Sequence, residues 1–97
     1  MGFFKKLFGK DNRDELKYML NNGALLIDVR SRDEFNAGHA PQAINIPLQM
    51  LIQTLDKLKG KTVIAVCKSG VRSAMAVSML KKEGVKAFNG GVWNNWQ

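Results

Sequence analysis

Two apolar runs rich in β-branched residues constrain the fold of this chain more than any other feature. "ALLIDV" (24–29) and "TVIAV" (62–66) are continuous rather than alternating in polarity, which is typical of strands covered on both faces. Such strands occur in parallel sheets, because the helices that connect parallel strands pack on both faces of the sheet. The sequence therefore predicts an α/β fold with a small open, mainly parallel β-sheet flanked by helices.

Helical patterns separate and follow these runs. Apolar residues recur at helical spacing over 11–22, 51–58 and 72–84, and a glycine stands at or just beyond the end of each segment. The segment 72–84 has the strongest amphipathic pattern, with lysines near its end. Its expected inward side chains are Ala76, Val77 and Leu80.

A short helix and two short strands complete the expected order. Ser31-Arg32-Asp33-Glu34 matches a capping box, in which the Ser31 hydroxyl accepts the Glu34 amide and the Glu34 side chain reaches back. The helix that this box opens should end by Gly38. The expected strands are "QAINIP" (42–47) and "VKAF" (85–88).

Length and composition bound the class of protein. A chain of 97 residues makes one domain with a modest core. Its single cysteine cannot form an internal disulfide, and no apolar run approaches the roughly 20 residues that span a bilayer, so we expect a cytoplasmic protein. The net charge of +7 suggests a nucleic-acid partner at first. The lysines and arginines are scattered, however, and aromatic residues do not interleave with them, so no nucleic-acid partner is expected.

The beginning of the chain is basic and aromatic. We divide the chain into an N-terminal segment, 1–15, and a domain, 16–97. Within "MGFFKKLFGK" (1–10), the phenylalanines and the leucine can share one side of a helix that carries lysines elsewhere. This pattern fits a starting helix that packs its phenylalanines on the domain. It fits, more weakly, a segment that contacts a membrane surface or a partner.

The only cysteine follows the second apolar run and precedes the amphipathic helix. The loop between them reads Cys67-Lys68-Ser69-Gly70-Val71-Arg72-Ser73. Free amides and the positive dipole end of a helix favour a thiolate over a thiol, as do Lys68 and Arg72, and the same amides can surround a bound anion. A buried cysteine acting as a small apolar side chain is the alternative. That alternative does not explain the basic, glycine-containing loop, so a reactive thiol is favoured.

Three stretches together resemble the single-domain rhodanese family of thiosulfate-type sulfurtransferases. They are "LIDVRSRDEFNAGHAPQAINIP", the Cys67-x4-Arg72-Ser73 loop and "NGGVWNNW". The resemblance extends from about Leu16 to the end of the chain. One departure is that the family usually has glycine in place of Pro41 or Gln42, which should affect a turn rather than chemistry.

The resemblance implies a sulfurtransferase without a cofactor. Cys67 would take a sulfane sulfur as a persulfide, and the amides of residues 68–73 would surround the outer sulfur. The implied donor is a small anion such as thiosulfate, a polysulfide or a low-molecular-weight persulfide, and the acceptor is a thiol or cyanide. A partner protein that relays sulfur is also compatible with this reading.

Other polar residues of the matching stretches are expected to support the fold. Asp28 and Arg30 follow the first strand, where they can form a buried ion pair with Glu34 or the backbone. The alternative is that Arg30 adds positive potential to the site. We favour the structural role, and Glu34 is expected to be a helix cap. His39 matches a family position that supports a turn. No metal site is expected, because one histidine and one cysteine cannot supply the four ligands of structural zinc.

Two rival functions remain open from the sequence. Relatives of the fold that act as phosphatases or arsenate reductases use a cysteine loop one residue longer, whereas four residues separate Cys67 and Arg72 here. A shorter ring of amides suits one sulfur atom. The second rival is a non-catalytic sulfur carrier or interaction module. Such modules often lack the cysteine, which this chain retains beside Arg72. A carrier that keeps its cysteine and receives persulfide from a partner enzyme stays open as the alternative.

Overall fold

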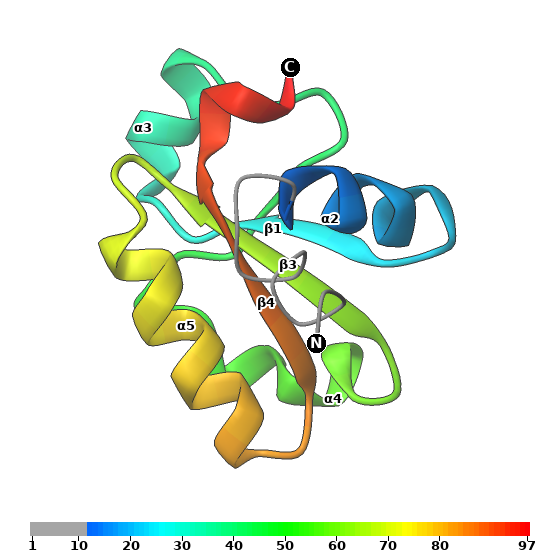
Figure 1. Cartoon of the computed structure of the whole chain (residues 1–97). Coiled ribbons are helices and arrows are strands. Elements are labelled where there is room, and N and C mark those ends of the chain that lie inside the picture. The colour runs from blue at the N-terminus through cyan, green and yellow to red at the C-terminus, as the bar shows by residue number, and fades with distance from the viewer. Residues whose placement is uncertain (1–11) are drawn as a thin grey trace.

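A four-stranded parallel sheet forms the centre of the computed structural model, which describes residues 12–97 (Figure 1). The strand order is β2-β1-β3-β4. Their bounds are Leu25–Asp28 for β1, Ile44–Asn45 for β2, Thr62–Cys67 for β3 and Lys86–Val92 for β4. Every neighbouring pair is parallel, so the predicted α/β fold with an open parallel sheet is confirmed.

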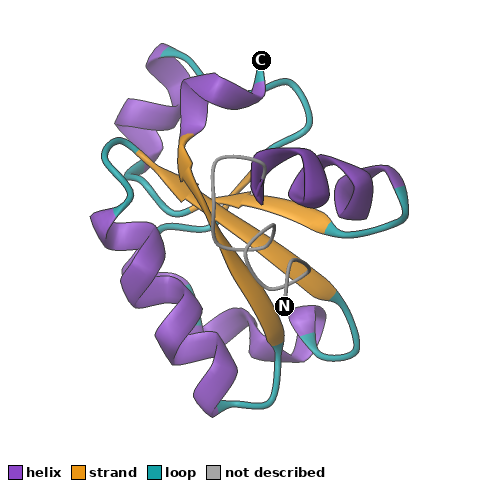
Figure 2. Ribbon diagram, in the orientation of Figure 1, coloured by secondary structure: helices purple, strands orange, loops and turns teal. Residues whose placement is uncertain are grey.

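Helices cover both faces of this sheet (Figure 2). They are α2 (Asn12–Asn21), α3 (Arg32–Ala37), η1 (Leu48–Met50), η2 (Ile52–Thr54), α4 (Leu55–Leu58), α5 (Val71–Lys82) and η3 (Trp93–Trp96). Helices α4 and α5 pack on one face, while α2 and η3 pack on the other. None of the helices within residues 12–97 is long and apolar enough to cross a membrane.

Strand β3 is apolar and buried after Thr62, because it contributes to both layers of the core. Its side chains alternate, so that Val63, Ala65 and Cys67 join the layer under α5. Ile64 and Val66 join the layer under α2 and η3. The lone cysteine therefore ends an inner strand on the α5 face, and only residues 68–70 separate it from that helix.

Several local predictions are confirmed. The helix predicted over 72–84 is α5, and its residues Ala76, Val77 and Leu80 are buried. The capping box at Ser31 is formed, and α3 ends at Ala37, before Gly38. The predictions for the segment 1–10 lie outside the described residues.

Other predicted elements differ from the structure in their extent. The strand expected over 42–47 is reduced to Ile44–Asn45. The helix expected over 51–58 is divided into η2 and α4, since the Thr54 hydroxyl bonds the Leu51 carbonyl at 2.8 Å in competition with the helical backbone. The last strand runs on to Val92 rather than ending at residue 88, because after a bulge Gly91 and Val92 still pair with the end of β3.

That bulge shapes the end of the sheet where Cys67 lies. Ala65 pairs with Asn89 and Val66 pairs with Gly91, so Gly90 is the additional residue. A Cβ atom at Gly90 would lie 2.8 Å from the Cγ2 atom of Ile64 and 2.9 Å from the Cγ1 atom of Val66. Glycine is therefore needed here for close packing of β4 on β3.

We predict that Gly90→Ala destabilises the domain. The added methyl group has to displace buried side chains of β3, which should lower the free energy of unfolding by about 1–3 kcal/mol. Chemical denaturation monitored by circular dichroism measures this change. A neutral or stabilised variant, as found where alanine fits without a clash, would contradict the packing described.

Candidate active site

The loop after β3 folds back over the sulfur of Cys67. Cys67 is buried, and Lys68 and Ser69 after it are exposed. Gly70 is the N-cap of α5 with φ of 97°, a left-handed conformation that glycine adopts readily. In this conformation the Gly70 nitrogen lies 2.9 Å from the Cys67 Sγ atom.

Hydrogen-bond donors from the start of α5 surround the same sulfur. The Ser73 backbone nitrogen and the Ser73 Oγ atom both lie 3.4 Å from Sγ. Burial raises the pKa of the Cys67 thiol, but hydrogen bonds from Ser73 and from the backbone N–H groups of Ser69 and Gly70 lower it by more, so it lies below its usual value. The loop and the helix start thus favour the reactive thiolate.

An ion pair fixes the first turn of α5 to α3. The guanidinium of Arg72 donates to both carboxylate oxygens of Glu34, over 2.7 and 3.0 Å. The Arg72 hydrogen bond holds the pKa of Glu34 well below its usual range, and the pair raises the pKa of Arg72. Glu34 caps α3 as predicted, but its ion pair with Arg72 was not predicted. Arg72 therefore supports the loop as well as adding charge.

Asp28 and Arg30 form a separate buried ion pair at the end of β1. The Arg30 Nη2 atom lies 2.8 Å from the Asp28 Oδ2 atom, with side chains 5% and 0% exposed. Arg30 also donates to the backbone oxygens of Glu34 and Gly38, and its guanidinium carbon lies 4.4 Å from the centre of the Trp93 ring. These contacts tie β1 to α3 and η3, which supports the structural role for both residues.

Comparison with known proteins identifies the domain. The family model for the rhodanese-like domain matches residues 12–97, which is most of the chain. The chain belongs to this family.

Individual relatives agree with this assignment. The chain is 38% identical over 73 residues to a protein from Thermoplasma acidophilum named tRNA sulfurtransferase, covering 75% of this chain but only 15% of that protein. The human single-domain sulfurtransferase TSTD1 superposes with a TM-score of 0.74 at 31% identity, over 86% of this chain and 89% of that one. A rhodanese-like domain protein from Staphylococcus aureus gives a TM-score of 0.73 at 32% identity, over 87% and 85% of the two chains.

The predicted site residues of this rhodanese-like domain fall into two groups. Gly70 and Ser73 meet the sulfur of Cys67 directly. The side chains of the other predicted loop residues are exposed or half-buried: Lys68, Ser69, Val71 and Arg72.

His39 stacks on Phe35, with ring centres 3.8 Å apart, and its Nδ1 atom lies 2.8 Å from the Phe35 carbonyl oxygen. These contacts fit a structural role for His39.

Two asparagines at the same end of the sheet were not predicted. Asn45 donates to the backbone oxygens of Asp28 and Arg30, both at 3.0 Å. Asn89 joins β4 to the loop through Ser73 and Gly70. A sequence signal existed, since each asparagine stands in or next to the end of a predicted parallel strand. Side chains from such strand ends gather at one edge of a sheet.

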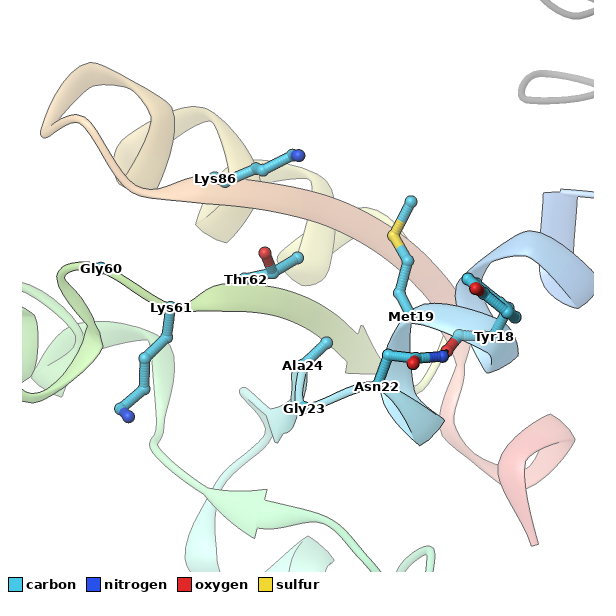
Figure 3. A pocket seen from close by; sticks show the side chains of 9 residues that line it. All are labelled: Tyr18, Met19, Asn22, Gly23, Ala24, Gly60, Lys61, Thr62 and Lys86. Atoms are coloured by element: carbon cyan, nitrogen blue, oxygen red, sulfur yellow. The ribbon is translucent and has the colours of Figure 1, made fainter.

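A surface pocket of the rhodanese-like domain lies at the opposite end of the sheet (Figure 3). Its lining includes Tyr18 and residues that begin β3 and β4, whereas Cys67 ends β3. Lys61 and Lys86 extend in different directions there (Figure 3). The pocket is therefore separate from the sulfur site and lacks a convergent charged group.

We predict that Glu34→Gln removes a pH-dependent part of the stability. Because folding depresses the pKa of Glu34, its contribution is complete above the unfolded-state pKa of about 4.3 and is lost as the pH falls further. Because the ion pair is about one-third exposed, we expect Glu34→Gln to lower the free energy of unfolding by about 0.5–1 kcal/mol at pH 7. This difference from wild type should become smaller below about pH 4. Denaturant unfolding across this range measures it.

The control is Glu83→Gln, since Glu83 is exposed beyond the last turn of α5. It should change stability less than Glu34→Gln at pH 7. Equal losses from both substitutions would show that the Arg72 pair does not stabilise the fold.

Proposed function

We propose that this protein is a sulfurtransferase that carries sulfane sulfur on Cys67. The supporting observation is the convergence of the Gly70 and Ser73 N–H groups on a sulfur whose pKa is lowered. Membership of the rhodanese-like family supports the same chemistry, as does similarity to proteins named sulfurtransferases. The role of Cys67 is that of the nucleophile and sulfur carrier.

The transfer takes place in two displacements. The Cys67 thiolate attacks the outer sulfur of the donor, so that a new S–S bond forms as the donor's S–S bond breaks. With thiosulfate, sulfite leaves with the electron pair of that bond. A thiolate or cyanide acceptor then attacks the outer sulfur of the persulfide, and Cys67 departs as a thiolate. The N–H groups of the loop stabilise the negative charge on sulfur in both states.

The loop has to move for a donor to reach the sulfur. Cys67 has no exposed surface, and the Gly70 nitrogen already lies 2.9 Å from Sγ. Displacement of residues 68–70 opens the site, and the same residues can then enclose the added sulfur. Lys68 stands exposed in this segment, where its charge can attract an anionic donor.

The short distance between the loop and the Cys67 sulfur favours a sulfur donor over a phosphate or arsenate substrate. Four residues lie between Cys67 and Arg72, and one of them, Gly70, already places its nitrogen 2.9 Å from the sulfur. A tetrahedral oxyanion needs a wider ring of N–H groups for its several oxygens. The Arg72 fork that could bind such an anion is occupied by Glu34.

We predict that Cys67 becomes a persulfide on incubation with thiosulfate. Intact-mass analysis should show the addition of one sulfur atom. Cyanide should then remove this atom and restore the original mass. Cys67→Ser should show no addition, because its hydroxyl is a poor nucleophile at neutral pH. An unmodified wild-type protein, or an adduct that persists in the serine variant, would contradict the assignment. Repeated turnover with cyanide distinguishes an enzyme from a carrier loaded by a partner.

We also predict different kinetic effects from the two cations of the loop. Lys68→Ala should raise KM for thiosulfate about threefold with kcat nearly unchanged, because an exposed charge mainly attracts the donor. Arg72→Ala should lower kcat about tenfold as well as raising KM, since it frees the helix start from Glu34. Lys81→Ala, in the last turn of α5, is the control. KM effects alone from both loop variants would mean that Arg72 serves only as a charge.

A further inference from the structure

A chain of hydrogen bonds leads from β4 to the sulfur of Cys67. The side-chain amide of Asn89 makes three hydrogen bonds although the residue is exposed. Its Oδ1 atom accepts from the Ser73 hydroxyl at 2.7 Å and from the Gly91 nitrogen at 2.9 Å. Its Nδ2 atom donates to the Gly70 carbonyl oxygen at 3.1 Å.

The backbone determines which way this amide points. The N–H of Gly91 is only a donor and the carbonyl of Gly70 is only an acceptor, so exchanging the Asn89 oxygen and nitrogen would break both contacts. The Oδ1 atom must therefore face Ser73, and the Ser73 hydroxyl must be the donor. A hydroxyl carries one proton. While that proton is given to Asn89, Ser73 presents only lone pairs to the Sγ atom 3.4 Å away.

We propose that Asn89 is a positioning residue that competes with the Cys67 sulfur for the hydroxyl proton of Ser73. With the proton on the Asn89 side, Ser73 stabilises the thiolate through its backbone N–H alone, and its hydroxyl oxygen can accept from the Cys67 thiol. The protonated form is then more favoured than it is when the hydroxyl donates to the sulfur. When the hydroxyl turns toward the sulfur, it donates to the thiolate instead and gives up its bond to Asn89. Asn89 therefore restrains thiolate formation. This inference deepens the proposed function, because the thiolate is the attacking form there.

A purely mechanical role for Asn89 predicts a different result. Asn89 also holds the loop through Gly70, so in a mechanical role its loss loosens the cover over the sulfur. The Gly70 carbonyl has a second partner in the Ala74 nitrogen at 3.1 Å, which keeps the helix start in place. A loosened cover would speed reaction of Cys67 at every pH without moving the midpoint of its titration.

Charged groups near the loop are the same in every variant needed for the test. They are Lys68 in the loop, Arg72 from α5, Glu34 from α3, and Asp28 and Arg30 from the end of β1. Substituting Asn89 or Ser73 removes no charge. A change in the titration of Cys67 in these variants therefore reports the hydrogen bonds.

The test measures the pH dependence of Cys67 alkylation by iodoacetamide. We expect Asn89→Ala to lower the pKa of Cys67 by about one unit, because the Ser73 hydroxyl becomes free to donate to the thiolate. In the Ser73→Ala background the same substitution should shift the pKa by less than about 0.3 unit. Asn89→Val, which suits a strand, should repeat the effect of Asn89→Ala. Asn94→Ala, an exposed asparagine in η3, should leave the pKa unchanged.

Three results would overturn the proposal. They are an unchanged or raised pKa in Asn89→Ala and Asn89→Val, an equal shift with and without the Ser73 hydroxyl, and faster alkylation at all pH values with a fixed midpoint. Alkylation needs no sulfur donor, so the test holds even if Cys67 forms no persulfide. Conversely, persulfide formation with no coupling between Asn89 and Ser73 would reject this inference and keep the proposed function.

Discussion

The structure depends on the contact between the sulfur that ends β3 and the N–H groups that begin α5. Helix starts leave their first amides without partners in the helix, and here those of Gly70 and Ser73 turn to the Cys67 sulfur. The parallel sheet makes this possible, because it places the carboxyl end of its central strand beside the start of the following helix. Burial alone would favour the neutral thiol, and the converging donors reverse that preference. The chemistry of the site thus follows from where the strand ends.

Neighbouring elements hold this contact in place from both sides. Helix α3 binds the first turn of α5 through Glu34 and Arg72, while β4 reaches the loop through Asn89. The ion pair between Glu34 and Arg72 is about one-third exposed, and such pairs add little stability. Its importance therefore lies in orienting the loop. The bulge at Gly90 belongs to the same arrangement, since it offsets the end of β4 against β3 next to Asn89. Three segments distant in sequence therefore determine the geometry around one thiol.

The sequence predicted the parallel sheet and the position of Cys67 because both follow from local patterns. Continuous apolar runs indicate buried strands, and a helical pattern directly after Cys67 places it at a helix start. Interactions between distant segments were not predictable in this way. Glu34 was interpreted as a cap and as one alternative partner of the Asp28 and Arg30 pair, since nothing near it in sequence indicates Arg72 as a partner. For Asn89, the neighbouring strand end indicates the edge of the sheet where it lies, but nothing near it in sequence indicates its partners Ser73 and Gly70. The division of the chain at residue 16 stays a prediction.

Production of thiocyanate from thiosulfate and cyanide, measured beside hydrolysis of an aryl phosphate, tests the central claim most directly. If the loop is built to hold sulfur on Cys67, the wild-type protein forms thiocyanate over many turnovers and Cys67→Ser forms none. Phosphate ester hydrolysis should be absent in both proteins, because the short loop already holds the Gly70 nitrogen against the sulfur and its arginine is paired with Glu34. Hydrolysis of the aryl phosphate through Cys67 without any sulfur transfer would contradict the account.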